Sequence, residues 1–219
     1  MPTHPKVTLV TCKAQPTLFH GEEGLPDELA ARGCDPQVKV WNDPDVDWSD
    51  AGMIVVRSVS DYAQDRRAFL EWTRSLRRVQ NSCDVLDWNS DKHYLKELAA
   101  LGMPTIPTNW LEPAQNLSKH QIHTRFPAFG EFVVKPAVSS GVRDIGRYTT
   151  VDTRQRQAAM RQVQGLLGEG RSVMIQRYVE EIDLHGEISL VFFNGLVSHA
   201  VEKRAALHPS SITDPTVHE

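Results

Sequence analysis

The stretch from Phe132 to Tyr148, FVVKPAVSSGVRDIGRY, constrains the fold more than any other part of the sequence. Its apolar start predicts a buried strand that ends near Lys135, because Pro136 cannot extend a central hydrogen-bond ladder. Residues 137–141 are small or polar, and such a loop exposes backbone N–H groups that can surround phosphate oxygens. The neighbouring lysine supplies a compact charge for the same anion. The alternative is a β-hairpin with a polar turn and a solvated lysine.

The bulk composition predicts a folded protein of one large or two small domains, with 219 residues and 40% hydrophobic residues. A net charge of −4 without a long basic run argues against nucleic-acid binding. No apolar run approaches the roughly 20 residues that span a bilayer, so we expect no membrane partner. The N-terminus lacks the pattern of a signal peptide. Together with the odd number of cysteines, this predicts a cytoplasmic protein with free structural thiols, and a catalytic role for one thiol is the alternative. They are Cys12, Cys34 and Cys83.

The first part of the chain alternates between strand and helix patterns, which predicts a doubly wound α/β domain with a parallel sheet. Ligands bind such sheets at the carboxyl ends of the strands. Arg57 and Ser58 end the apolar run 53–56, and Tyr62 follows shortly after. We predict that these three residues contact an anionic substrate. A salt-bridged surface arginine is the alternative.

A second cation candidate lies further along the chain. Ser90 is the expected N-cap of a helix that ends at Gly102 and carries Lys92 in its first turn. A cation in a first turn opposes the helix dipole, and a bound anion would explain it. A solvated lysine is the alternative. Pro104 and Pro107 then mark a linker.

The second part predicts a long helix and three further strands. We expect the helix at 152–167 and a strand at 173–179, followed by a β-hairpin. Asn194-Gly195 joins its strands, 187–193 and 196–203, and is the dipeptide that type I′ turns prefer. A two-residue loop would place Phe193 opposite Leu196 and Glu187 opposite Glu202.

Several strings resemble one family. Lys92 early in a helix, VVKP ending at Pro136, the loop 138–141, and MIQRYVEEI followed by GEISLVFFNG resemble the ATP-grasp ligases, in their glutathione-synthetase-like branch. VVRSVSDY and SHAVEKR are similar to its small bacterial members, such as synthetases of the D-cycloserine type. The resemblance covers almost the whole chain. It implies an α/β domain at 1–88, an α+β ATP-grasp subdomain with its linker at 89–179, and an incomplete second ATP-grasp subdomain at 180–219.

The resemblance also implies which residues contact ATP phosphates. Lys92 and Lys135 would contact them from two sides. Ser139, Ser140 and Gly141 would form the flexible loop that closes over them. Phosphoryl transfer needs this kind of positioning and charge neutralisation.

Further roles implied by the resemblance concern adenine, ribose and catalysis. Glu181 would accept hydrogen bonds from the ribose hydroxyls. Lys203 and Arg204 would face the γ-phosphate or an acyl phosphate and act in catalysis. The backbone of a hinge segment would meet the adenine edge. It consists of Gln176, Arg177, Tyr178 and Val179.

The expected Mg²⁺ site has no ligand in the given sequence. Family members carry their metal ligands on strands after the hairpin, so we expect the ligands beyond Glu219. The residues 205–219 have no clear periodicity and are expected to form a loop. Asp214 does not lie in a matching context.

These observations predict an ATP-dependent ligase. It would activate a small, amino-acid-like carboxylate as an acyl phosphate for attack by an amine-type nucleophile. A nucleotide-binding module that lost its metal site is one alternative, and an α/β interaction protein without a ligand is another. The resemblance leaves open whether the chain forms a homodimer.

Overall fold

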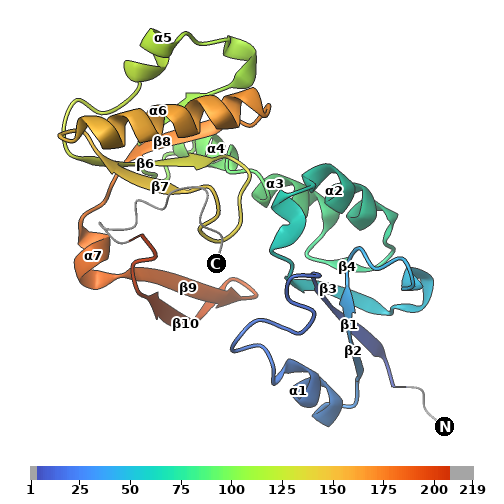
Figure 1. Ribbon diagram of the computed structural model, residues 1–219. Coiled ribbons are helices and arrows are strands. Elements are labelled where there is room, and N and C mark those ends of the chain that lie inside the picture. The colour runs from blue at the N-terminus through green and yellow to red at the C-terminus, as the bar shows by residue number, and fades with distance from the viewer. Residues whose placement is uncertain (1–3, 208–219) are drawn as a thin grey trace. The chain divides into compact units, whose positions relative to one another are not determined.

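The computed structural model describes residues 4–207 and divides the chain into two compact units. Unit 1 is Met1–Tyr94 and unit 2 is Leu95–Glu219, and Figure 1 labels their elements. The first predicted boundary, after residue 88, lies close to the end of unit 1. The further predicted division after residue 179 stays a prediction. The predicted loop at the C-terminus lies, from residue 208 on, outside the described residues.

A four-stranded parallel sheet forms the centre of unit 1, with strand order β2-β1-β3-β4. Its strands are β1 (Lys6–Thr11), β2 (Asp35–Val40), β3 (Met53–Ser58) and β4 (Val79–Gln80). The helices among them are α1 (Leu25–Ala31), α2 (Arg66–Ser75) and α3 (Cys83–Asn89), with 3-10 turns at Trp48–Asp50 and Asp61–Ala63. This arrangement confirms the predicted α/β fold with a parallel sheet.

Helix α2 shows how local sequence fixes an element in unit 1. The Asp65 carboxylate caps its start by accepting a hydrogen bond from the Ala68 amide at 2.9 Å. The helix ends at Ser75 because Leu76 is extended, with φ −84° and ψ 143°. Its inner face buries Phe69, Leu70 and Thr73.

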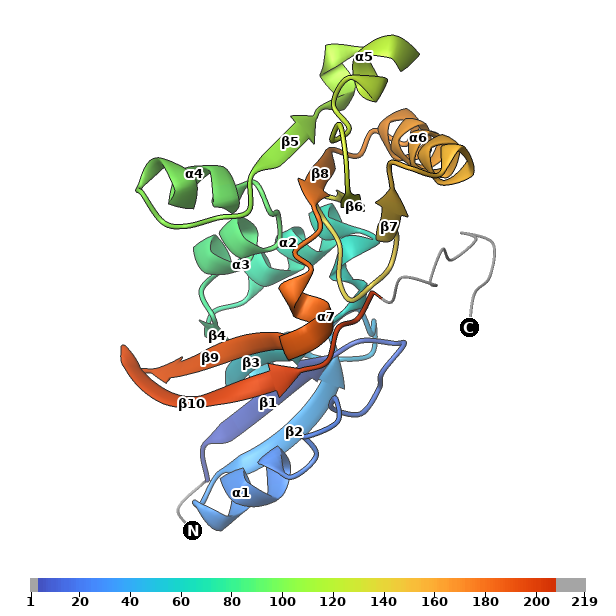
Figure 2. The same ribbon diagram turned by 90° about the vertical axis from the view of Figure 1, so that its left-hand side faces the viewer.

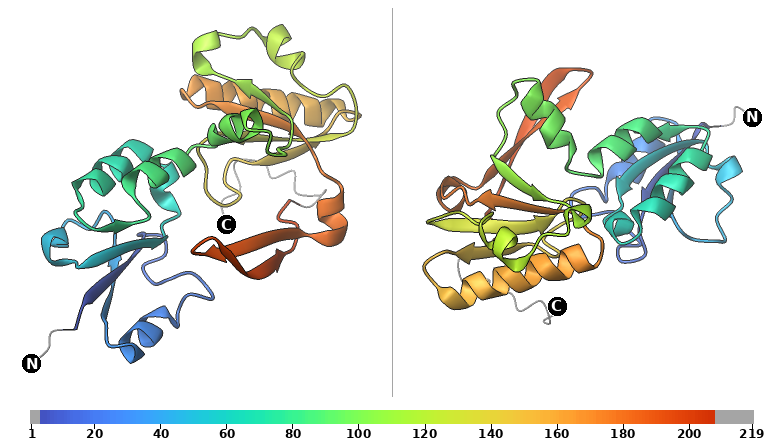
Figure 3. Two further views of the ribbon diagram at one scale, coloured as in Figure 1. Left: turned by 180° about the vertical axis from the view of Figure 1, so that it is seen from behind. Right: turned by 90° about the horizontal axis from the view of Figure 1, so that it is seen from above.

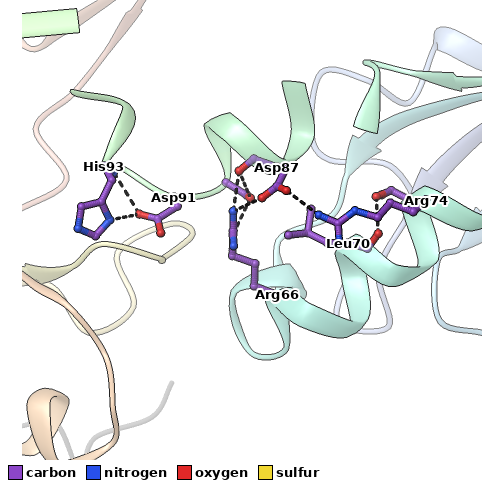
Figure 4. A network of polar contacts seen from close by, with 8 residues as sticks. Arg66, Leu70, Arg74, Asp87, Asp91 and His93 are labelled. Atoms are coloured by element: carbon purple, nitrogen blue, oxygen red, sulfur yellow. Dashed lines mark hydrogen bonds and ion pairs between the residues drawn. The ribbon is translucent and has the colours of Figure 1, made fainter. Parts of the chain in front are cut away.

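The predicted helix start at Ser90 is wrong. Ser90 is the C-cap residue that follows α3, and its backbone is still helical, with φ −74° and ψ −10°. Its hydroxyl donates to the Asp87 carbonyl at 3.1 Å and accepts from Arg66 Nε at 2.8 Å. Figure 4 shows the Arg66–Asp87 ion pair of this network. The next helix, α4 (Tyr94–Ala100), begins later, so Lys92 lies in the turn before it and not in its first turn.

A four-stranded antiparallel sheet forms the centre of unit 2, with strand order β5-β8-β6-β7. Its strands are β5 (Thr108–Leu111), β6 (Glu131–Pro136), β7 (Gly146–Thr149) and β8 (Val173–Arg177). Its helices are α5 (Lys119–His123) and α6 (Thr153–Gly168), with a 3-10 turn at Pro113–Gln115. Helix α6 lies along one face of the sheet (Figure 3). The predicted strand, loop and second strand of 132–148 are thus β6, its loop and β7.

The core of unit 2 lies between this sheet and α6. Phe132 of β6 is fully buried, and the centre of its ring lies 5.1 Å from the centre of the Phe126 ring and 5.8 Å from that of Tyr148. Val163 of α6 is also fully buried in this cluster. Burying a side chain of this size stabilises the unit by about 1.5–3 kcal/mol, so the aromatic group holds the helix on this face.

The opposite face of the sheet carries the candidate site. Val134 and Ile175 belong to the core with α6, and side chains alternate across a strand. Lys135 and Met174, which pair across β6 and β8, therefore lie on the other face. We call it the site face. Arg147 of β7 lies on it by the same alternation.

A short helix and a β-hairpin complete unit 2 (Figure 2). They are α7 (Glu181–His185), β9 (Glu187–Phe193) and β10 (Leu196–Lys203). The predicted type of turn is confirmed, since Asn194 and Gly195 both have positive φ, at 50° and 79°. The predicted pairing of Phe193 with Leu196 is also confirmed.

The predicted pairing of Glu187 with Glu202 is wrong. A bulge between Val197 and His199 adds one residue to β10 and shifts the register from there on. Lys203 therefore lies opposite Glu187. The bulge replaces a repulsive pair of carboxylates by a pair of opposite charges.

The three cysteines are free thiols, as expected. Cys12 is buried, and Cys83 donates a hydrogen bond to the Thr73 carbonyl at 3.0 Å. Within residues 4–207, no helix combines the length and the hydrophobicity needed to cross a bilayer.

Candidate functional site

Lys135 is the central residue of the site face. It lies at the end of β6 and is half-buried. Burial lowers the pKa of the Lys135 ammonium, and the Glu187 carboxylate opposes this shift. Within residues 4–207, the Lys135 side chain forms no hydrogen bond or ion pair. A half-buried cation in this state gains from a bound anion, because the anion compensates for the water that burial removes.

The loop after Lys135 has fixed ends and an open middle. Ser139 is 7% exposed, and Asp144 is held by an ion pair to Arg171 at 2.8 Å. Gly141 has a φ of +63° and no other atom within 4 Å of where a Cβ would lie. Ser140 beside it is half-buried. The predicted closing loop thus has, at Gly141, a backbone conformation that favours glycine and room to move.

The side chains of the first two predicted hinge residues support neighbouring strands. Gln176 is buried, and its amide nitrogen donates to the Thr108 hydroxyl of β5 at 2.7 Å. Arg177 is exposed on the α6 side, with its guanidinium 4.6 Å from the centre of the Phe129 ring. Gln176 lies on the site face by alternation but is buried against β5, and Arg177 lies on the other face, so neither side chain is exposed to a ligand on the site face.

The backbone directly after β8 leaves the Val179 amide available. The Tyr178 amide donates to the Glu131 carbonyl at 2.9 Å, and the Val179 carbonyl accepts from Ile182 at 3.1 Å. The Val179 amide forms no hydrogen bond with any of the residues 4–207. Glu181 begins α7 and is exposed. An acceptor on a planar ring could therefore bind to the Val179 N–H.

Asp183 and Arg147 lie beside this segment and were not identified as site residues from the sequence. The Tyr178 hydroxyl donates to Asp183 at 2.5 Å, and the Arg147 guanidinium lies 3.5 Å from the centre of the Tyr178 ring. Burial, together with the hydrogen bond to Asp183, raises the pKa of Tyr178 to about 12. The only sequence signal for Arg147 is a charge in the middle of a short buried strand, GRYT.

The hairpin brings a second cation toward Lys135. Glu187 acts electrostatically on Lys135 and pairs with Lys203 across the hairpin. Lys203 and Arg204 are both exposed. Lys135 of the sheet and Lys203 of the hairpin therefore share one carboxylate neighbour, Glu187, which the sequence analysis had not assigned to the site.

The predicted substrate residues lie at the carboxyl end of β3 in unit 1. Arg57 forms an ion pair with Glu22, and Ser58 donates to the same carboxylate at 2.7 Å. The Ser58 hydroxyl also accepts from the Phe19 amide at 3.0 Å. Tyr62 packs against the core of unit 1, and burial raises the pKa of its hydroxyl. The alternative of a salt-bridged arginine therefore describes Arg57, whose partner Glu22 the sequence analysis did not identify.

Lys92 lies in a well-defined turn of unit 1. Asp91 accepts hydrogen bonds from the His93 amide at 3.1 Å and from its ring at 2.6 Å (Figure 4). Lys92 lies between these two residues and is half-buried. Because it belongs to unit 1 and Lys135 to unit 2, the convergence of the two lysines on one triphosphate stays a prediction.

A cavity of about 340 Å³ in unit 2 lies away from the site face. Its lining includes Asn109, Ile175 and Arg177, whose side chains are on the α6 side of the sheet. Among residues 4–207, no group of three His, Cys, Asp or Glu side chains could hold a metal ion. The candidate site thus consists of Lys135, its loop, the Val179 amide and the hairpin.

Comparisons with known proteins converge on one group. A family model for the N-terminal domain of D-cycloserine synthetase DcsG matches residues 7–86. The cycloserine biosynthesis protein DcsG of Streptomyces lavendulae is 37% identical over 195 residues, and the match covers 87% of this chain. The chain spans 61% of the length of that protein.

Solved structures match as well. The crystal structure of D-cycloserine synthetase DcsG has a TM-score of 0.81 and 33% identity, covering 93% of this chain and 69% of that one. The crystal structure of a RimK domain ATP-grasp protein from Sphaerobacter thermophilus has a TM-score of 0.57 and 16% identity. That match covers 80% of this chain and 64% of the other, and shows the fold alone.

Proposed function

Because this chain belongs to the ATP-grasp ligases related to D-cycloserine synthetase, we propose that it binds ATP as part of an ATP-dependent ligase. The ligase activates a small, amino-acid-like carboxylate for attack by an amine-type nucleophile. The similarity to D-cycloserine synthetase supports ligation of this kind.

The observation that carries the proposal is the state of Lys135. It is half-buried at the end of a strand, and burial lowers its pKa. Its ammonium has no hydrogen bond or ion pair to any of the residues 4–207. A phosphate group on the site face would supply the missing counter-charge, and lysine is well suited to phosphate as a compact point charge.

The remaining residues contact different parts of the proposed ligands, ATP and the acid. The loop at Ser139, Ser140 and Gly141 covers the phosphates, and the Val179 amide meets the adenine edge. Glu181 accepts from the ribose hydroxyls. From unit 1, Lys92 contacts the phosphates, and Arg57 and Ser58 contact the acid once Glu22 is displaced.

The cations at the end of the hairpin have a role in forming the acyl phosphate. A carboxylate is a poor electrophile, and phosphorylation gives it a leaving group that an amine can displace. Lys203 and Arg204 stabilise the negative charge on the transferred oxygens. The covering loop keeps water away from the reactive acyl phosphate. Mg²⁺ accompanies ATP in this proposal, and we assign no residue of this chain to it.

Calorimetric titration with Mg-ATP tests the binding, and ADP release with candidate D-amino acids and amines tests the reaction. Free nucleotide at 100 times its dissociation constant should add about 2.7 kcal/mol to the free energy of unfolding. No heat and no stabilisation at millimolar ATP would contradict the proposal. Binding without acid-dependent ADP release would favour the alternative, a nucleotide-binding module without catalysis.

A further inference from the structure

Arg147 of β7 is the most completely engaged charged side chain of the site face. Only 5% of its side chain is exposed. Its Nε donates to Glu131 at 2.9 Å, and Nη2 bonds to the same carboxylate. Nη1 and Nη2 donate to the two Asp183 oxygens at 2.9 and 2.7 Å. Nη1 also donates to the Leu207 carbonyl at 2.9 Å, so all five N–H groups of the guanidinium are used.

The charges around Arg147 make this contact strong. Burial alone would lower the pKa of its guanidinium, but the hydrogen bonds to Asp183 and Glu131 outweigh burial and raise it. The fork-to-fork geometry with Asp183 is the strongest form of such a contact. The Tyr178 ring lies 3.5 Å from the guanidinium and adds a cation–π contact.

The partners of Arg147 come from both ends of the hairpin. Asp183 lies in α7, just before β9 begins at Glu187, and Leu207 follows the end of β10 at Lys203. The two ends of the hairpin are in close backbone contact, since a Cβ on Gly186 would lie 2.3 Å from the Lys203 carbonyl oxygen. One guanidinium on the sheet therefore holds both the incoming and the outgoing strand.

The hairpin itself buries little apolar surface against the rest of unit 2. Leu190 is 58% exposed, Phe192 54% and Val197 61%. A two-stranded hairpin is marginally stable alone in water. Its orientation toward the sheet therefore depends on how its ends are held.

We propose that Arg147 is a positioning residue that anchors both ends of the hairpin to the sheet and so holds Lys203 and Arg204 on the side of Lys135. The anchoring stands on the contacts of Arg147 alone. Its consequence for nucleotide binding rests on the proposed function.

Hydrogen exchange of the full chain tests the anchoring. In Asp183→Asn, the amide group faces the guanidinium with its own donors, so the fork contact is lost while the size is kept. Arg147→Lys keeps the charge but cannot reach three separate acceptors at once. In both variants, the amides of β9 and β10 should exchange about tenfold faster, while those of β6 and β8 stay within about twofold. Unchanged exchange in the hairpin would overturn the anchoring.

Glu112→Gln is the matched control. The Glu112 side chain is 30% exposed, close to the 28% of Asp183, and it bonds to Lys96 and Ser172 away from the hairpin. This variant should leave exchange in the hairpin unchanged. Equally faster amide exchange in the hairpin and the sheet of Asp183→Asn would show a general loss of structure and would overturn the positioning role.

Nucleotide titration tests the consequence. The Asp183→Asn variant should bind Mg-ATP about tenfold more weakly than the unsubstituted chain, and Glu112→Gln equally well. Equal affinity in Asp183→Asn together with a loosened hairpin would overturn the positioning of Lys203 and Arg204. If the unsubstituted chain binds no nucleotide, the proposed function fails, and hydrogen exchange alone still decides on the anchoring.

Discussion

Arg57 in unit 1 and Lys135 in unit 2 occupy equivalent places in the sequence pattern, since each ends an apolar strand, yet their surroundings differ. Arg57 pairs with Glu22, a carboxylate 35 residues away in sequence that also accepts from Ser58. Lys135 pairs with none of the residues 4–207, and burial lowers its pKa. The same pattern thus produces a neutralised cation in one unit and an unsatisfied one in the other.

A cation at a strand end is therefore a stronger binding candidate when no distant carboxylate forms an ion pair with it. A paired arginine must exchange one anion for another, so the net gain from a ligand is small. A desolvated lysine without an ion pair gains the whole free energy of its contact with the ligand.

The largest effect is expected for Lys135→Met. A hydrogen bond to a charged group contributes about 2 kcal/mol, so Mg-ATP should bind roughly 30-fold more weakly. The free energy of unfolding should not fall, because methionine has a similar shape and carries no buried charge. Calorimetric titration and urea unfolding measure the two quantities on the same variant.

Arg57→Met is the matched comparison for Lys135→Met. It should change nucleotide affinity little, because Arg57 lies at the proposed acid site. It should lower stability, because Glu22 loses its partner. Equal losses of nucleotide affinity in the two variants, or a marked destabilisation by Lys135→Met, would break the contrast.

A smaller effect is expected for Glu22→Gln in unit 1. The Glu22 side chain is 20% exposed and bonds to both Arg57 and Ser58. Loss of its charge should lower the free energy of unfolding by about 1–2 kcal/mol. Glu28→Gln is the control, since its pair with Arg32 is mostly exposed on both sides and should contribute little to stability. Equal stability of the two variants would mean that Glu22 does not neutralise Arg57.

Much of the fold followed from local sequence. Periodicity predicted most strands of the two four-stranded sheets, and the Asn194-Gly195 turn predicted the hairpin, because these signals depend on neighbours within a few residues. The prediction that Ser90 begins a helix failed because a serine that follows one helix and a serine that begins another look alike in sequence. Only Arg66, which bonds to Ser90 and comes from another helix, decides between them.

The candidate site was predictable only in part. Lys135 stood out because a lysine between an apolar strand and a small-residue loop is a local pattern. The Arg147 partners, Glu131, Asp183 and Leu207, come from three segments, and no spacing rule connects them. The register of the hairpin depended on a bulge, which shifts every pair beyond it without a residue type that marks it.

The smallest effect is the pH dependence that Lys135 gives to stability. Because burial places its pKa in the folded chain below the ordinary value of 10.5, the unfolded chain binds this proton more tightly. The cost of the charged lysine is fully present below the folded pKa and disappears as the pH rises toward 10.5. The stability of the unsubstituted chain, relative to Lys135→Met, should therefore rise with pH across this window. Glu187 opposes the shift, so Glu187→Gln should widen the window toward lower pH. Urea unfolding at a series of pH values measures both differences, and a relative stability that falls with rising pH would mean that an internal anion already satisfies Lys135, as Glu22 satisfies Arg57.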